Sequence, residues 1–100
     1  MFVAIACDLG SEDHRESVHR LLLQYGLKRV QDGAYESVTI NAEALLRLKK
    51  ELDRLTDAYD SLRIYQFPME GGLVVTSLKD KKWRKTVVSS GNRGSTPNRG

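Results

Sequence analysis

Residues 2–7, Phe-Val-Ala-Ile-Ala-Cys, form an unbroken apolar run that stops at Asp8. In a β-strand, even-numbered and odd-numbered side chains point to opposite sides, and here both sets are apolar. A strand with one wet face would alternate polar and apolar residues. This strand is therefore predicted to lie inside a sheet, with both of its faces covered.

Two amphipathic helices are predicted further along the chain. The first begins after Ser11, a residue type that caps helix N-termini, and ends at Gly26, a residue type common just after helix C-termini. The second begins after Asn41 and carries leucines at positions 45, 48, 52 and 55, which line one side of a helix. Each helix thus has one apolar side that needs another layer to pack against.

Three further strand regions complete the predicted fold. Residues 28–40 are predicted to form a strand interrupted at Asp32-Gly33 by a tight turn or a bulge. Residues 61–67 and 73–78 are predicted to form two more strands. The order βαββαβ plus one C-terminal strand indicates an α+β, ferredoxin-like sandwich, in which both helices cover one face of the sheet.

The other face of that sheet bears on the oligomeric state. The first strand would present apolar side chains there, and monomers rarely expose such a patch. We therefore expect a two-fold homodimer that packs sheet face to sheet face. The extra strand, residues 73–78, either extends the partner's sheet or forms a hairpin at the edge of its own.

The length of the chain fits a single domain. Residues 1–88 are expected to form it, ending in a basic strand or extension, and residues 89–100 to be a disordered or tag-like tail. The single cysteine, Cys7, forms no intrachain disulfide and is expected to pack rather than react. No signal peptide or membrane span is visible, so a cytoplasmic protein without membrane contact is expected. The two histidines are expected on the surface of the first helix.

Positive charge is concentrated at the C-terminal end. Residues 1–78 carry 9 Lys and Arg against 12 Asp and Glu, a net of −3, whereas residues 79–100 carry 7 against 1, a net of +6. This asymmetry indicates an anionic partner, the alternative being a solvated, solubilising tail. The cations expected to contact phosphates of RNA or DNA are Lys79, Lys81, Lys82, Arg84 and Lys85. Trp83 among them either anchors the segment or stacks on a base.

Asp8 is the residue at which chemistry is expected. It follows an apolar strand and precedes a helix, and ligands tend to bind at the carboxyl ends of strands. A carboxylate there can hold Mg²⁺ or Mn²⁺. In a two-fold dimer, two copies of Asp8 would form a metal site that neither chain has alone. The alternative is a residue that only shapes the turn into the helix.

Several segments together resemble the CRISPR-associated protein two family. They are the strand that ends in Asp8-Leu9, the block Gln-Tyr-Gly-Leu-Lys-Arg-Val-Gln at residues 24–31, the pair Tyr35-Glu36, and Ser-Leu-Arg-Ile-Tyr at residues 61–65. Their order and spacing carry the resemblance, which covers residues 1–78. The chain departs from the family pattern at Cys7, where an aromatic residue is usual.

The resemblance implies a ferredoxin-like homodimer of the spacer-acquisition machinery, which bridges integrase-type subunits on DNA. It also implies a metal-dependent endonuclease, that is a phosphodiesterase acting on RNA or DNA. Asp8 would be its catalytic metal ligand, Arg15 and Arg29 would contact nucleic acid, and Tyr35 would pack a nucleotide.

Three alternatives stay open at this point. The protein could be a non-catalytic bridge that holds an integrase on DNA, or a toxin-type ribonuclease of similar fold. The third is an RNA-recognition sheet, which needs paired aromatic residues on its strands, and the first strand offers only Phe2.

Overall fold

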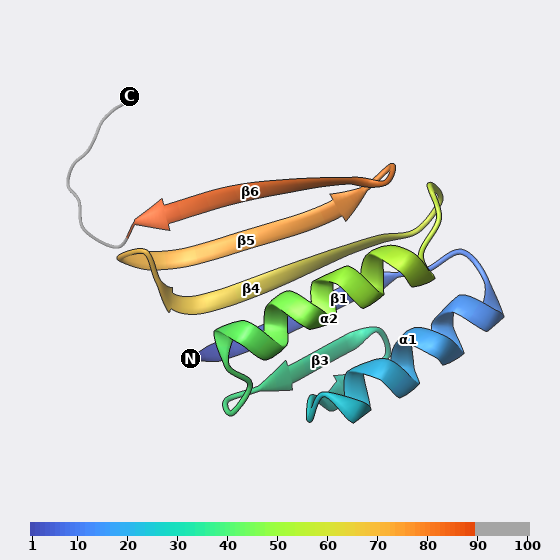
Figure 1. The fold of residues 1–100 in the computed structure, drawn as a ribbon, viewed down its shortest axis with the longest axis horizontal. Helices are drawn as coiled ribbons and strands as arrows, with labels where there is room; N and C mark the ends of the chain where they lie inside the picture. The colour runs from blue at the N-terminus through green and yellow to red at the C-terminus, as the bar shows by residue number, and fades with distance from the viewer. Residues whose placement is uncertain (90–100) are drawn as a thin grey trace.

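The computed structural model describes residues 1–89, which form two helices and six strands (Figure 1). The helices are α1, Glu12–Gln24, and α2, Ala42–Leu55. The strands are β1, Phe2–Asp8; β2, Lys28–Gln31; β3, Ala34–Ser37; β4, Ser61–Met69; β5, Gly72–Lys79; and β6, Lys82–Ser89. The first six elements follow the predicted βαββαβ order, so the α+β, ferredoxin-like prediction is confirmed.

The strands form one antiparallel sheet in the order β2-β3-β1-β4-β5-β6. As predicted, β1 lies inside it, paired with β3 on one side and β4 on the other. Both helices lie on the same face of this sheet (Figure 1). The opposite face, called the open face below, carries no element of the described chain.

The structure decides two points that the sequence left open in the C-terminal strands. β5 pairs with β4 of its own chain, so it forms the hairpin alternative and does not extend a partner's sheet. β6 pairs with β5 along its whole length, so the predicted basic strand or extension is a strand; the sequence left this open because the cations conceal the alternation of an edge strand. β6 ends at Ser89, and residues 90–100 of the predicted tail lie outside the described residues.

The predicted helix boundaries are confirmed by their caps. The Ser11 hydroxyl accepts a hydrogen bond from the His14 N–H at 3.1 Å, and the Asn41 side chain accepts one from the Ala44 N–H at 2.8 Å. Each bond satisfies an N–H that the first turn of a helix leaves without a partner. Gly26 follows α1 with φ of 85°, a left-handed conformation that favours glycine.

The junction at Asp32-Gly33 is a tight turn between β2 and β3, with a register shift just before it. Gly33 has φ of 77°, and its carbonyl accepts a hydrogen bond from the Cys7 N–H at 2.7 Å. A side chain at this position would lie 2.8 Å from the Cys7 carbonyl oxygen. Glycine therefore lets this turn close against the end of β1, beside Asp8.

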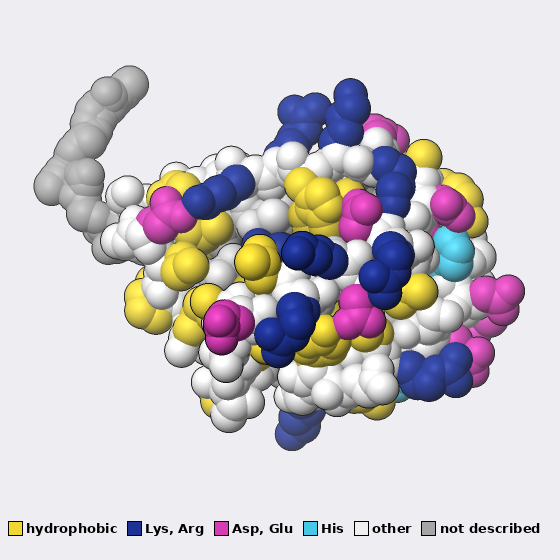
Figure 2. All heavy atoms as spheres, in the orientation of Figure 1, with side chains coloured by type: hydrophobic (Ala, Val, Ile, Leu, Met, Phe, Trp, Pro, Cys, Tyr) yellow, Lys and Arg dark blue, Asp and Glu magenta, His cyan; other side chains and the backbone are white. Residues whose placement is uncertain are grey.

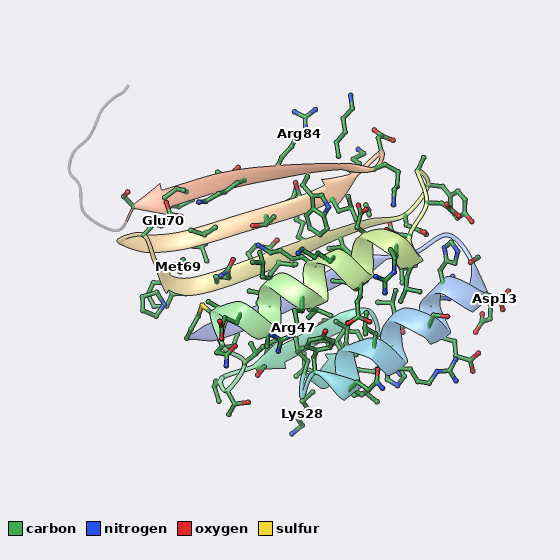
Figure 3. All side chains as sticks on the ribbon, in the orientation of Figure 1. Asp13, Lys28, Arg47, Met69, Glu70 and Arg84 are labelled. Atoms are coloured by element: carbon green, nitrogen blue, oxygen red, sulfur yellow. The ribbon has the colours of Figure 1, made fainter. Side chains whose placement is uncertain are left out.

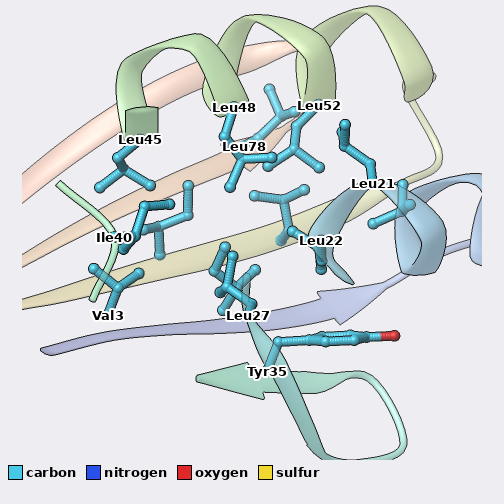
Figure 4. Packing of buried hydrophobic residues seen from close by; sticks show 14 residues of the cluster. Val3, Leu21, Leu22, Leu27, Tyr35, Ile40, Leu45, Leu48, Leu52 and Leu78 are labelled. Carbon is cyan, nitrogen blue, oxygen red and sulfur yellow. The ribbon is translucent and has the colours of Figure 1, made fainter. Parts of the chain in front are cut away.

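The core fills the space between the helices and the sheet (Figure 4). Apolar side chains of α1 and α2 meet the inward side chains of β1, β4 and β5 there. Each fully buried leucine contributes about 2 kcal/mol of transfer free energy. The central members of this cluster are Val3, Ile5, Leu22, Leu48, Leu52 and Ile64.

The open face is divided into an apolar end and a charged end. At the apolar end, Phe2 lies opposite Phe67, and Leu73 lies opposite Val88. Phe2, Phe67 and Val88 remain 37%, 50% and 50% exposed. This is the apolar open face that the sequence predicted.

Candidate metal and nucleic-acid site

Asp8 ends β1 at the charged end of the open face. Strand pairing places Asp8 opposite Ser61, Ser61 opposite Lys79, and Lys79 opposite Lys82. Directly opposed residues point to the same side of a sheet, so one row crosses four strands from a carboxylate to two cations. Asp8 and Lys79 are two strands apart, roughly 10 Å. Within residues 1–89, the Asp8 carboxylate makes no hydrogen bond or ion pair.

The next row on the open face adds two arginines. Ala6 lies opposite Arg63, Arg63 opposite Ser77, and Ser77 opposite Arg84. Arg84 extends outward from β6 (Figure 3). A shallow cavity of about 330 Å³ lies over these rows and is lined by Asp8, Arg63 and Lys79. The predicted residues Lys79, Lys82 and Arg84 thus lie on the same face of the sheet as Asp8, with Lys79 two strands and the other two residues three strands away from it.

Arg63 was missed by the sequence reasoning as a site residue. Its signal was present in the alternation of residues 61–65, which places Arg63 on the polar side of β4. The alternation does not reveal that β4 pairs with β1, and this pairing brings Arg63 to the same face of the sheet as Asp8.

On its other side, Asp8 borders a cavity of about 530 Å³ between α1 and the β2–β3 hairpin. This cavity is also lined by Arg15, Arg29 and Tyr35, so the residues that the family resemblance singled out do meet at one place. It holds more carboxylates than guanidinium groups. They are Asp8, Glu12, Glu16 and Asp32 against Arg15 and Arg29.

Both arginines of this cavity already have partners. Arg15 donates to the Glu12 carboxylate at 2.7 Å and to the Leu9 carbonyl at 3.1 Å. Arg29 donates to the Asp32 carboxylate at 3.1 Å. These pairs are largely exposed, where such contacts contribute about 0–1 kcal/mol. Either guanidinium can therefore turn to a phosphate at small cost.

Tyr35 is buried in the core and only 6% exposed. Its hydroxyl lies 2.6 Å from Nδ1 of His19 on α1, which means that this histidine is not a free surface residue. Burial raises the pKa of the Tyr35 hydroxyl, and the negative charge of a Cys7 thiolate would raise it further. Because the Tyr35 ring is enclosed by the core, a nucleotide cannot stack on it. Tyr35 lines the cavity, where its hydroxyl is the polar group.

A buried carboxylate that the sequence reasoning missed fixes the loop between β1 and α1. Asp60, with a side chain that is 0% exposed, accepts hydrogen bonds from the Gly10 N–H at 2.7 Å and the Asp57 N–H at 2.8 Å. Its other partner is the His14 ring, with Nδ1 at 2.6 Å. The His14 ring also stacks on Tyr59, so this histidine too is part of the packing.

Burial by itself would raise the pKa of Asp60. The N–H groups of Gly10 and Asp57 and the His14 ring outweigh burial, so the pKa of Asp60 lies below its ordinary value. The folded protein therefore stabilises the charged form of the Asp60 carboxylate. Because Gly10 is two residues from Asp8, this carboxylate helps to set where Asp8 leaves the strand.

Cys7 is a packing residue, as expected. Its side chain contacts the core, and burial raises the pKa of its thiol to about 12. A thiol of that kind is protonated at neutral pH and is a poor nucleophile.

The remaining predicted cations, Lys81 and Lys85, lie on the helix side of the sheet edge. Lys81 donates to the carbonyls of Asp53 and Thr56 at the end of α2. Trp83 donates to the Asp53 carboxylate at 3.2 Å, so it anchors the β5–β6 hairpin on α2. Lys85 pairs with Glu70.

Within residues 1–89, no three His, Cys, Asp or Glu side chains are gathered as they would be around a metal ion. A single chain thus offers the Asp8 carboxylate without further side-chain ligands around it. Mg²⁺ is often held by only one or two protein carboxylates, with waters and substrate phosphates completing its shell. The unpaired Asp8 fits that donor chemistry.

Fold and surface together define a small ferredoxin-like protein whose open sheet face carries the free Asp8 carboxylate in one row with two cations. The family model of CRISPR associated protein Cas2 matches residues 1–86, and the chain belongs to this family. The resemblance drawn from the sequence segments is thereby confirmed. Comparison with curated proteins gives no match. None of the helices in residues 1–89 is long and apolar enough to cross a membrane.

Proposed function

We propose that this chain is a homodimeric subunit of the spacer-acquisition machinery that cleaves phosphodiester bonds in RNA or DNA with the help of Mg²⁺ or Mn²⁺. Membership of the Cas2 family supports the setting. The observation that carries the site is the free Asp8 carboxylate on the open face, in a row with Lys79 and Lys82.

The proposed dimer follows from the apolar end of the open face. Phe2, Phe67 and Val88 are exposed there although they are large and apolar. A second copy that packs against this end would cover them on both chains at once, because a two-fold interface uses the same patch twice. The charged ends of the two open faces would then lie around the same interface, each with its own Asp8.

Asp8 and its twin would hold the metal ion, and Arg63 and Lys79 would bind the substrate. When bound, the ion would polarise the phosphate and lower the pKa of a bound water. Arg63 and Lys79 have no partner within residues 1–89, so their charges are available to phosphate oxygens. Asp60 would keep the β1–α1 loop, and with it Asp8, in place.

Replacement of Asp8 by Asn tests the proposal. The change keeps the shape of the side chain but removes the charge that a hard cation needs. We expect cleavage of labelled RNA and DNA to fall by about two orders of magnitude. Asp13→Asn, at an exposed position of α1 that does not line the cavity beside Asp8, is the matched control and should cleave normally. Undiminished cleavage by Asp8→Asn would contradict the catalytic role.

A second candidate function is a non-catalytic bridge between DNA and an integrase-type partner. It is favoured by Lys82 and Arg84, which lie on the same face as Asp8 but on the outer strand of the sheet, three strands from it. The bridge predicts DNA binding that weakens steeply with salt and is the same in Asp8→Asn. The two functions are thus separated by the same variant.

A further inference from the structure

A second cationic surface lies on the helix side of the molecule, along α2 and the β5–β6 hairpin. It is a groove of about 540 Å³ whose lining includes Lys49, Lys50, Arg54 and Lys81 but a single carboxylate, Asp53. The cavity beside Asp8 and α1 has more carboxylates than cations, so the groove is far more positive. Figure 2 shows Lys and Arg side chains gathered over α2 on this face.

The lone carboxylate of the groove does not neutralise it. Asp53 already accepts a hydrogen bond from Trp83 and lies 3.6 Å from the Lys81 ammonium. Lys81 is in turn held by backbone carbonyls at the end of α2. The positive charge that stays available is therefore that of Lys49, Lys50 and Arg54.

These three cations are poorly compensated. Within residues 1–89, Lys49 and Lys50 make no hydrogen bond or ion pair. Burial, followed by the nearby charge of Lys85, lowers the pKa of Lys49. Arg54 has only an exposed contact with Glu51, at 3.8 Å. An anion in the groove would relieve this repulsion.

The charge also continues around the edge of the sheet. Along β6, Lys85 points to the helix side, while Lys82 and Arg84 point to the open face. The outer strand thus has cations on both sides. A ligand that reaches both must be a long, regularly charged polyanion, and nucleic acid has that property whereas a folded acidic protein presents its charge in patches.

We propose that the groove formed by α2 and the β5–β6 hairpin is a second nucleic-acid contact, in which Lys49, Lys50 and Arg54 bind the phosphate backbone. The inference rests on the proposed function only for the kind of partner, since it needs no cleavage at Asp8. Side chains that reach only phosphates carry no sequence information, so this contact adds affinity and orientation.

The test is the salt dependence of binding to duplex DNA of mixed sequence, measured by fluorescence anisotropy with the whole chain. Lys49→Gln/Lys50→Gln should weaken binding on the order of tenfold near 0.1 M salt, and reduce the slope of log K against log salt by about 1.8. Arg20→Gln/Lys28→Gln removes the same charge from another surface and should change the slope little. Circular dichroism checks that both variants fold.

Two outcomes would overturn the inference. In the first, the groove variant binds like the Arg20→Gln/Lys28→Gln control, while Lys79→Gln/Lys82→Gln on the open face weakens binding. That result would leave the proposed function standing. In the second, binding of polyglutamate depends on Lys49 and Lys50 but binding of duplex DNA does not, which would identify an acidic protein as the partner. Loss of cleavage in Asp8→Asn has no bearing on either result.

Discussion

The two faces of the sheet are made by the same strands, yet their side chains are satisfied in different ways. On the helix side, Val3, Ile5 and Ile64 are completely enclosed by α1 and α2. On the open side, alternate residues of the same strands leave Phe2 and Phe67 exposed, and Asp8 without a partner in the described chain. The apolar side chains of the helix side are thus enclosed within one chain, whereas those of the open side are left for the proposed second copy to cover.

The largest effect is expected where the helix side is fully packed. Leu48→Ala removes a side chain with no exposed surface from the centre of the core (Figure 4). The free energy of unfolding should fall by about 2–5 kcal/mol, because the cavity left behind cannot be refilled. Chemical denaturation measures this loss. Leu46→Ala on the same helix, where the leucine is exposed, should cost less than about 0.5 kcal/mol. Equal losses would contradict the assigned packing.

An intermediate effect is expected at Asp60, which ties the β1–α1 loop to the loop after α2. Asp60→Asn should lower the free energy of unfolding by about 1–3 kcal/mol at neutral pH, because a buried charged acceptor is lost. The pKa of Asp60 is lowered in the fold, so its contribution is present above the ordinary carboxyl pKa and is lost as pH falls.

Denaturation at several pH values checks this sign. Between about pH 5 and pH 2, the unchanged protein should lose more stability than Asp60→Asn does. Asp32→Asn, at an exposed position, should follow the unchanged protein. The same acid dependence in Asp60→Asn as in the unchanged protein would show that another carboxylate is responsible.

The smallest effect on folding, but a large one on association, is expected on the open face. Phe2→Glu places a charge in the apolar end, so the proposed dimer should dissociate while the free energy of unfolding of the monomer changes by less than about 1 kcal/mol. Sedimentation velocity distinguishes the two states. Val38→Glu, at a position 71% exposed outside the strands, should stay dimeric. Unaltered association together with weaker binding of single-stranded RNA would instead make Phe2 and Phe67 a stacking surface.

Much of the fold could be predicted because its signals are local. Ser11 and Asn41 cap the helices, Gly26 ends the first helix, and the doubly apolar β1 had to be an inner strand. Strand β6 could be predicted only as a basic strand or extension, because an edge strand exposes both of its sides and Lys82, Arg84 and Lys85 conceal its alternation. The hydrophobic pattern of β5 fits a strand in its own sheet as well as a strand added to the sheet of a dimer partner. Only the pairing of β5 with β4 decides between these two alternatives.

The site was predictable only in part, for a related reason. Asp8 stood out because a lone acid closes an apolar strand. Asp60 lies in a polar connection and gives no signal until the fold brings it to Gly10, 50 residues away. The ring of Tyr35 was expected to pack a nucleotide, yet the spacing of β3 residues alone does not tell whether a side chain faces the helices or solvent.

The proposed cleavage depends most on Asp8 acting as one half of a shared metal site. The direct measurement is the stoichiometry of Mn²⁺ binding by isothermal titration calorimetry, with the unchanged protein, Asp8→Asn and Phe2→Glu. We expect one ion for two chains in the unchanged protein, and loss of that binding in both variants. One ion per chain that persists in monomeric Phe2→Glu, or binding that survives in Asp8→Asn, would contradict the shared site.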